Sequence, residues 1–475
     1  MRGKSKISTK LNPWKEKAKQ RGKKNHYLTR CVKNLRQSKK ALKSENRELN
    51  IANKILQKEL DAAKKLKTTR VINHSYSAEA MQLCVQLRTQ AGCSYRSCIQ
   101  VLNILVVLLN LELKIPHFSS IRNWEIKLGY HELQQTINTA DKWVLIIDES
   151  ISIGNQKMLL LIGINLSKYQ FGKALNLGDM RVLEIRLSKS WKAPDIEKVV
   201  KSVEQRGFTF EYCCCDNGNN LRKLLKTIGL VHIEDCGHAL GNWLKNRYKK
   251  EEVFLSFCTE STKTKRSLIL SKYAEYVPPK HRTKGKFLNL SAIAVWAKKI
   301  LFLAKQYQQT GTCKGAFEKI KWILKYEEFI LKLNEEQALI NKVNKLIKNK
   351  GLSKDIIITA EQIINQSNVE DGLKKYIQDY LERNKKKLPD LEKIICSSDI
   401  IESTFGKFKY NTSKSPNGAI TEGCLSVANY GKNFEINEIK NAMEETRIVD
   451  IKKWREENLP VSTQQKRRKL LKSAS

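Results

Sequence analysis

Five short apolar runs lie between residues 142 and 233, and their order constrains the fold more than any other feature of the sequence. Three runs follow one another directly, and two more alternate with segments of helical periodicity. A run of four to eight apolar residues between polar or glycine-containing breaks is typical of a buried strand. The predicted order is therefore strand, strand, strand, helix, strand, helix, strand. The predicted strands cover residues 143–147, 157–164, 181–187, 208–215 and 231–233.

Helical segments separate the last three predicted strands. Pro194 opens the first helix and Gly207 ends it, and a second helix follows Gly218 and runs to about residue 228. Three consecutive strands followed by alternating helices and strands are typical of a ribonuclease-H-like domain, although other α/β folds share this periodicity. We expect an α/β ribonuclease-H-like core in which the first and fourth strands lie side by side.

An aspartate directly follows the first and the fourth predicted strand. Asp148 ends the run at 143–147, and Asp216 follows three consecutive cysteines at the end of the run at 208–215. A carboxylate after several apolar residues is costly unless it is exposed or binds something, although one such aspartate often only marks a strand end. On neighbouring strands the two carboxylates could share Mg²⁺ or Mn²⁺, which prefer oxygen ligands.

A third carboxylate, Glu402, lies on a helix predicted from residue 394 to about residue 410. Ile401, Phe405 and Phe408 would bury this helix against the sheet and place Glu402 at its edge. Asp399 lies three residues earlier, on the same helical face. The alternative interpretation is a solvated acidic turn without a chemical role.

Leucines recur every seven residues near the N-terminus and predict a long amphipathic helix. They are Leu28, Leu35, Leu42, Leu49 and Leu56. The positions four residues after each leucine hold Val32, Lys39, Asn46, Asn53 and Leu60. Leucine at every d position is typical of a parallel two-stranded coiled coil, in which Asn or Lys at a lowers stability but favours one register. The alternative is one charged helix whose apolar stripe packs on its own domain.

Three further helices are predicted at about 77–90, 95–110 and 121–128, with a tight turn at Gly92 and a glycine, Gly129, that ends the last one. This arrangement favours a helix-turn-helix module whose last helix enters the major groove, although a generic three-helix packing unit fits the same pattern. The expected buried face of the last helix holds Ile121, Trp124 and Leu128. The expected DNA-binding side chains face away from it and are Ser120, Arg122, Asn123 and Lys127.

The net charge of the chain indicates which kind of molecule it binds. The 475 residues include 88 Lys+Arg and 48 Asp+Glu, a formal net charge of +40, and residues 1–70 alone hold 23 cations and 5 acids. Such an excess of positive charge is unusual for an enzyme that acts on small metabolites. It favours nucleic acid as the partner, with an anionic membrane surface as the weaker alternative. The basic N-terminus lacks the apolar stretch of a signal peptide, and the most apolar run, at 101–113, is too short to cross a bilayer.

The remaining stretches complete the predicted organisation. Residues 240–390 contain few strand signals and many helical periodicities, which predicts an all-α insertion. The twelve cysteines lack the spacing of a disulfide framework, so we expect reduced thiols in a reducing compartment. The predicted parts are a disordered basic arm (1–26), a coiled coil (27–68), a helix-turn-helix domain (75–135), the first part of the core (140–239), the helical insertion (240–390), the closing helix of the core (391–435) and a basic tail (436–475).

A second motif makes the carboxylate pattern more specific. The sequence Asp235-Cys236-Gly237-His238 follows the fifth predicted strand. Together with Asp148, Asp216 and Glu402 it resembles DDE transposases of insertion sequences, in which an Asp-x-x-His signature lies between the second Asp and the Glu and a helical insertion can precede the Glu. The resemblance covers about residues 75–430.

The resemblance implies a DNA transposase that cleaves and joins DNA strands with two Mg²⁺ or Mn²⁺ ions. Asp148 would bridge both ions, and Asp216 and Glu402 would each hold one. The implied partners are the terminal inverted repeats, the target DNA and a second copy of the chain, as a homodimer or higher oligomer, without a membrane. The implied location is the bacterial cytoplasm, at the nucleoid. Asp235 and His238 would order the loop near the site or form a simple structural hydrogen bond.

The sequence departs from this family pattern around Glu402. One bacterial subgroup has Arg four residues before the Glu, Tyr seven before it and Lys seven after it; here these positions hold Ser398, Ile395 and Lys409. Only Lys409 fits, so Lys409, with Lys407 beside it, is a candidate phosphate contact. Trp243 could stack on a flipped base, but a core position is the stronger interpretation. A non-catalytic DNA-binding protein derived from a transposase, and a nuclease or resolvase of the same fold, remain alternatives.

Overall fold

The computed structural model contains two compact units, which are described separately. One unit comprises residues 1–68 and 100–115, and the other comprises residues 69–99 and 116–475. The structure describes residues 13–64, 69–110, 113–137, 140–153, 156–279, 290–413, 420–459, 461, 466–468 and 470–471.

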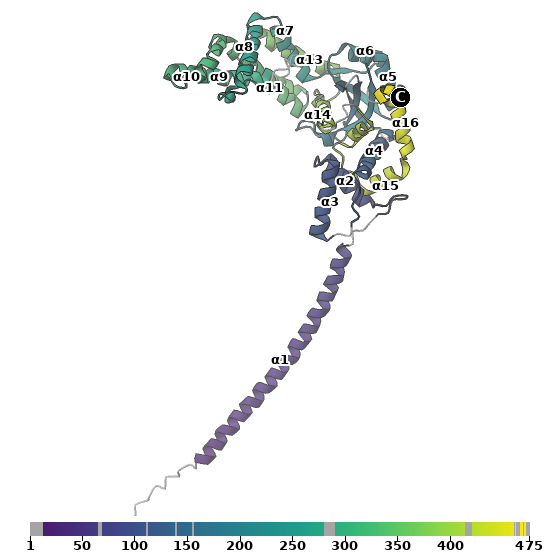
Figure 1. Cartoon of the computed structure of the whole chain (residues 1–475), viewed down its shortest axis with the longest axis vertical. Helices are drawn as coiled ribbons and strands as arrows, with labels where there is room; N and C mark the ends of the chain where they lie inside the picture. The colour runs from purple at the N-terminus through teal and green to yellow at the C-terminus, as the bar shows by residue number, and fades with distance from the viewer. Residues whose placement is uncertain are drawn as a thin grey trace, which may run out of the picture. The chain divides into compact units, whose positions relative to one another are not determined.

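The first unit contains the 52-residue helix α1 (Pro13–Lys64) (Figure 1) and the part of α3 (Tyr95–Leu109) from residue 100 onward. Pro13 suits the first position of a helix, where its missing N–H is not needed. Residues 13–26 are helical, whereas the sequence predicts a disordered arm there; residues 1–12 lie outside the described part. The prediction relied on the missing apolar periodicity, but Lys, Arg, Gln and Ala form helices without an apolar face.

The second unit is built on a five-stranded sheet with the order β3-β2-β1-β4-β5. β1 pairs antiparallel with β2, and β2 with β3, whereas β1 and β4, and β4 and β5, are parallel. All five predicted strands are present, and the first and fourth are neighbours. The strands are β1 (Lys142–Ile153), β2 (Gln156–Asn165), β3 (Arg181–Ser188), β4 (Thr209–Cys215) and β5 (His232–Glu234).

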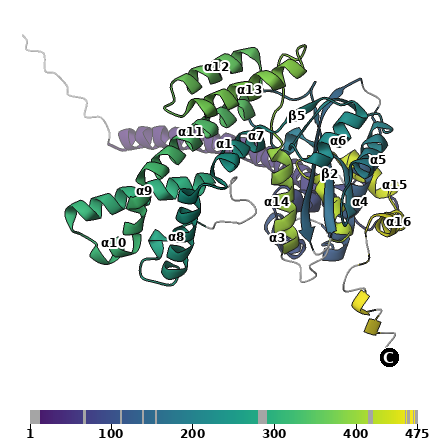
Figure 2. The same cartoon turned by 90° about the horizontal axis from the view of Figure 1, so that it is seen from above.

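Alternating side chains of the strands feed two separate apolar cores. On one face, residues such as Leu145 and Cys213 pack under α5 (Ala193–Glu204) and α6 (Asn219–Ile228). On the other face, residues such as Ile146 and Cys214 pack against helices that include α14 (Asp399–Ser413). Figure 2 shows α14 on the opposite side of the sheet from α5 and α6. The three consecutive cysteines are buried and unpaired, as predicted.

The stretch predicted as a helical insertion consists of helices in the described residues between β5 and α14. Ile394 to Ser398 are not part of α14, although the sequence predicts a helix from residue 394. The reason is that Ile394 forms an isolated antiparallel bridge with Leu352, which holds this segment extended. The helices are α7 (Cys236–Tyr248), α8 (Glu252–Leu268), α9 (Leu290–Thr310), α10 (Lys314–Ile320), α11 (Glu327–Lys350), α12 (Lys354–Asn365) and α13 (Asp371–Lys387).

Helices from both ends of the chain pack together around α4 (Phe118–Gln134). α4 passes straight through Gly129, which the sequence predicts as its end. A Cβ at Gly129 would lie 2.0 Å from the carbonyl oxygen of Leu425, so this glycine allows a close backbone approach instead of stopping the helix. The other elements of this region are α2 (Ala78–Thr89), the 3₁₀ segment η4 (Glu422–Asn429), α15 (Ile436–Glu445) and α16 (Ile448–Asn458).

The two C-terminal helices correct one predicted boundary. Residues 436–458 form α15 and α16, which pack on α4, so the predicted basic tail is in large part a folded piece of the second unit. Among the described residues, none of the helices combines the length and the apolar character needed to span a bilayer.

Candidate active site

The parallel pairing of β1 and β4 brings the first two predicted carboxylates together. Ile146 pairs with Cys214, and Asp148 and Asp216 each follow two residues later. Side chains two residues apart point to the same face of a strand, and neighbouring strands are about 4.8 Å apart. Asp148 and Asp216 therefore lie at matching positions on the face that α14 covers.

α14 brings the third carboxylate to the same face. Ile401, Phe405 and Phe408 are buried in the core shared with the sheet, as the sequence predicts. Glu402 lies on the rim of this contact, with 56% of its side chain exposed. Its position leaves the carboxylate accessible from solvent while the helix beneath it is fixed by packing.

Asp148 is the carboxylate most perturbed by this arrangement. Its pKa rises from the usual 3.8 to about 7, chiefly because burial disfavours the charged form. The negative charges of Asp216 and Glu402 raise the pKa further, and the positive charge of His238 opposes the rise. The pKa of Asp148 thus responds to both other predicted carboxylates, as expected of a group that shares a site with them.

The two defining residues of the Asp-x-x-His motif have different roles: Asp235 is structural, and His238 belongs to the site. Asp235 is fully buried, and its carboxylate caps α7 by accepting a hydrogen bond from the backbone N–H of His238 at 2.7 Å. The other oxygen accepts hydrogen bonds from the backbone N–H and the hydroxyl of Ser398, at 2.6 and 3.0 Å. Asp235 thereby ties the start of α7 to the segment that leads into α14.

The imidazole of His238 points to Glu402 and not to Asp235. Its Nε2 lies 3.3 Å from Oε1 of Glu402. This hydrogen bond raises the pKa of His238 to about 9 and lowers the pKa of Glu402. A protonated His238 therefore holds the Glu402 carboxylate in its ionised form, next to Asp148 and Asp216.

A lysine from the helical insertion reaches the same region, and sequence reasoning missed it. Lys348, near the end of α11, forms an ion pair with Asp399, one turn before Glu402. Burial opposes the charge of Lys348, but the hydrogen bond to Asp399 prevails and raises its pKa. Lys348 also contributes to the lowered pKa of Glu402. Nothing in the local sequence distinguishes Lys348 from the other lysines of the insertion.

A polar cavity of about 560 Å³ separates α11 from α7 and α14, with His238 and Glu402 in its wall. One face of α11 lines it with side chains at helical spacing, namely Gln337, Asn341, Asn344 and Lys348. Within the described part of the chain, the amide oxygens of Gln337 and Asn344 are buried without a hydrogen-bond partner. These side chains recur every three or four residues along α11, whose other positions hold both apolar and charged residues.

The predicted recognition helix does not stand free. Ile121, Trp124 and Leu128 are buried as predicted. Lys127, however, is buried as well and donates to the backbone oxygen of Met443 at 3.1 Å. η4, α15 and α16 enclose α4, so α4 cannot enter a groove without moving them.

The other three predicted DNA contacts on α4 differ in exposure. Arg122 forms an ion pair with Glu422 at 2.7 Å. Asn123 is exposed and Ser120 half-buried. Ser120 and Asn123 line a surface pocket beside the loop that joins α15 to α16. Lys127 and Arg122 thus make contacts within the second unit, whereas the helix-turn-helix interpretation stays a prediction.

The two candidate lysines of α14 also differ. Lys407 is half-buried, donates to the backbone oxygen of Thr89 and lies over the ring of Tyr430, 4.7 Å from the centroid. Lys409 is exposed, and its charge is one of those that lower the pKa of Glu402. Trp243 is partly buried against the main core, which fits the core interpretation.

The donor chemistry of the site suits a hard divalent cation, since all three predicted ligands are carboxylates. As the side chains are placed, no group of three or more His, Cys, Asp or Glu residues in the described ranges is close enough to hold a metal ion. Mutual repulsion of ionised carboxylates disfavours their closest approach in the absence of a cation.

Comparison with known proteins shows a distant structural likeness. No known family model matches the chain, and no curated protein matches it. Among solved structures, the chain is similar to one described as "Drosophila P element transposase strand transfer complex". The identity is 12%, the match covers 77% of this chain and 99% of that chain, and the TM-score is 0.37. The proposed function rests on the site geometry described above.

Proposed function

We propose that this protein is a transposase with a ribonuclease-H-like core that cleaves and joins DNA strands with the help of divalent cations. One observation carries the proposal: Asp148 and Asp216 each lie two residues beyond Ile146 and Cys214, the last paired residues of the adjacent parallel strands β1 and β4, and α14 packs on the same face with Glu402 at its rim. The pKa of Asp148 supports a shared site because it responds to both other carboxylates.

The three carboxylates Asp148, Asp216 and Glu402 would hold Mg²⁺ or Mn²⁺. Such ions activate an attacking water or 3′-hydroxyl and stabilise the leaving oxygen of an in-line displacement. His238 keeps Glu402 ionised and oriented. Asp148 must lose its proton before it can bind a cation, so cation affinity should rise with pH up to about 7.

The charge distribution supports a DNA substrate. The acidic cluster lies in a chain with a net charge of +40. Lys409 is exposed on the same helix as Glu402, and Lys348 lies beside Asp399 at the start of that helix. Cations on both sides of the carboxylates suit a phosphate backbone, which supplies sequence-independent, salt-sensitive affinity.

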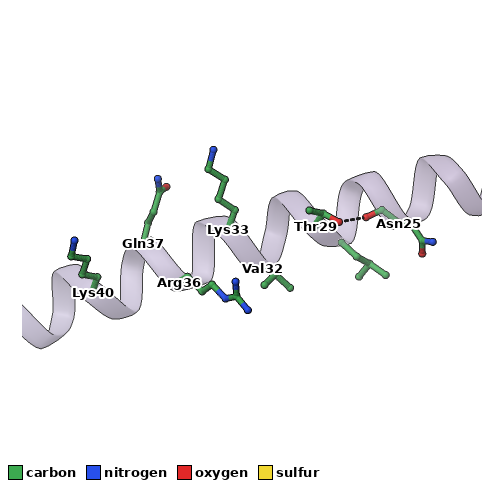
Figure 3. A pocket seen from close by; sticks show the side chains of 8 residues that line it. Asn25, Thr29, Val32, Lys33, Arg36, Gln37 and Lys40 are labelled. Atoms are coloured by element: carbon green, nitrogen blue, oxygen red, sulfur yellow. Dashed lines mark hydrogen bonds between the residues drawn. The ribbon is translucent and has the colours of Figure 1, made fainter.

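We also propose that α1 pairs with α1 of a second copy. The seven-residue leucine stripe is exposed along the helix, as an unpaired coiled-coil seam would be. Figure 3 shows Val32 on the helix surface, together with the charged side chains of Lys33, Arg36 and Lys40. Cations around a short apolar seam fit an arm that both dimerises and contacts DNA phosphates.

Cation binding distinguishes this enzyme from a non-catalytic DNA-binding relative. Mn²⁺ should raise the melting temperature of the wild type and should leave that of Asp216→Asn unchanged. Asp371→Asn is a matched control, because Asp371 is a fully exposed carboxylate of α13. No shift of the wild type at millimolar Mn²⁺ would favour the non-catalytic protein. Cleavage without strand joining would favour a nuclease or resolvase.

A further inference from the structure

The polar cavity beside Glu402 contains buried hydrogen-bond acceptors that the proposed chemistry does not use. Gln337 is only 9% exposed, and in the described ranges its Oε1 and the Oδ1 of Asn344 are buried without a hydrogen-bond partner. Both side chains line the cavity of about 560 Å³. A buried acceptor without a partner costs free energy, so two of them in the wall of one polar cavity point to a ligand that donates to them.

Two hydrogen bonds fix the orientation of the Gln337 amide. Its Nε2 donates to Oδ1 of Asn341 at 2.9 Å, and Nδ2 of Asn341 donates to Oγ of Ser291 at 3.2 Å. The amide nitrogen of Gln337 is thus used within the protein, and the oxygen is left to accept from a ligand. The cavity therefore suits a ligand with N–H donors rather than an apolar group or a small anion.

The cavity extends from the carboxylate site along α11. Glu402 and Lys348 lie in its wall together with Gln337. Lys348 pairs with Asp399 at the start of α14, and Gln337 precedes Lys348 on the helix by about 16 Å, at a rise of 1.5 Å per residue. A group attached to the phosphate that reacts at Glu402 could therefore reach the amides.

An unpaired nucleotide of the DNA substrate fits this chemistry. Adenine, cytosine and guanine carry amino groups that donate to amide oxygens, and in a duplex these groups are used by base pairing. The volume of the cavity lies in the range of small-molecule pockets, about 300–1,000 Å³, and is far too small to enclose a duplex. Lys348 lies at the carboxylate end of the cavity, where a cation suits the phosphate of such a nucleotide.

We infer that Gln337 and Asn344 hold the unpaired base of the nucleotide next to the cleaved phosphate, and that their amide oxygens select bases with an amino group. This assignment rests on the proposed DNA cleavage and names the part of the substrate that sets its specificity. Thymine has no amino group, and its carbonyl oxygens would face the amide oxygens. Thymine should therefore be the least favoured base at this position.

Cleavage of duplexes that differ only in this nucleotide tests the inference. Each duplex carries the inverted repeats flanking the gene and has adenine, cytosine, guanine, thymine or an abasic site next to the cleaved phosphate. In Mg²⁺, wild type should cleave the three amino-bearing versions about tenfold or more faster than the thymine and abasic versions, because these leave the buried amide oxygens unpartnered. Equal rates for all five versions would overturn the inference.

A double variant assigns the preference to the two amides. Gln337→Leu, Asn344→Leu should cleave all five duplexes at rates within about threefold of one another, and its urea midpoint should be no lower than that of wild type, because apolar side chains replace unpartnered acceptors. The matched control Gln308→Leu, Gln309→Leu removes two exposed amides of α9 and should keep the wild-type preference. A wild-type preference in the first variant would contradict the assignment.

Fluorescence of 2-aminopurine at the same position gives a second measurement, in EDTA and therefore without cleavage. This base fluoresces more strongly when it leaves the stacked duplex, so its signal should rise on binding to wild type and much less on binding to Gln337→Leu, Asn344→Leu. An equal rise with both proteins would overturn the inference. Loss of the rise on addition of a micromolar free nucleoside triphosphate would assign the cavity to a free nucleotide and would also overturn it.

These outcomes distinguish the inference from the proposed function. Cleavage of every duplex at one rate would contradict the base selection and leave the transposase proposal standing. No cleavage of any duplex by wild type, together with no shift of its melting temperature in Mn²⁺, would contradict the carboxylate site and with it the assignment of the cavity.

Discussion

Replacement of Asp148 by Asn should make the cation-free protein more stable while it removes activity. Asp148 is largely buried, and its pKa rises from 3.8 to about 7 in the folded protein. A raised carboxyl pKa means that the folded state prefers the protonated form. The contribution of protonated Asp148 to the free energy of unfolding is fully present below about pH 4 and is lost as the pH rises through about 7.

The magnitude follows from the same values. A difference of about 3 pH units corresponds to roughly 4 kcal/mol, at 1.36 kcal/mol per unit. Asn has nearly the same shape and no charge, so Asp148→Asn should regain up to about 4 kcal/mol at pH 8 and almost nothing at pH 4. His238, whose pKa is raised to about 9, stays protonated over this range in the wild type.

The assay is thermal or urea unfolding in EDTA, from pH 4.5 to pH 8.5, for wild type, Asp148→Asn and the exposed control Asp371→Asn. We expect the Asp148→Asn variant to melt several degrees above the wild type at pH 8, and the difference to shrink steadily toward pH 4.5. Saturating Mn²⁺ should remove the advantage, because only the wild type gains from the cation. A variant that is less stable than wild type at pH 8, or a gain that is independent of pH, would refute the proposed cause of the pKa shift.

Three further predictions address the packing and the neighbours of the site. Gly129→Ala should destabilise by about 1–3 kcal/mol through its backbone clash, whereas Gly406→Ala, in an open position of α14, should stabilise by up to about 1 kcal/mol; equal urea midpoints would contradict this. Lys348→Ala should slow DNA cleavage about tenfold with under 1 kcal/mol of lost stability, and Lys348→Arg should retain most of the rate; equal rates for both variants would contradict a role for the charge. Glu402→Gln should lower the pKa of His238 from about 9 toward 6.5, as measured by NMR titration of the imidazole; an unchanged pKa would show that another group sustains it.

The strand order and the two aspartates could be predicted because both depend on local sequence. Apolar runs mark buried strands, and a carboxylate at the end of such a run lies at the edge of the sheet. The pairing of Ile146 with Cys214 then places Asp148 and Asp216 side by side. Glu402 could be placed because Phe405 shows which face of α14 is buried.

The surroundings of α4 could not be predicted, because its partners are distant in the sequence. The local sequence predicts that Lys127 and Arg122 are exposed cations. In the structure, Lys127 donates to the backbone oxygen of Met443 and Arg122 forms an ion pair with Glu422. The role of Lys348 is hidden for the same reason, since only the folded insertion brings it to Asp399. A charged face of a helix is therefore exposed to solvent only where no segment from later in the chain packs on that face.

Strand cleavage and joining test the central claim most directly. The substrate is a labelled duplex that carries the inverted repeats flanking the gene, incubated in Mg²⁺ with wild type, Glu402→Gln or Asp371→Asn. We expect cleaved and joined products with wild type and Asp371→Asn, and none with Glu402→Gln although this variant still binds the duplex. Full cleavage and joining by Glu402→Gln would contradict the carboxylate site proposed here.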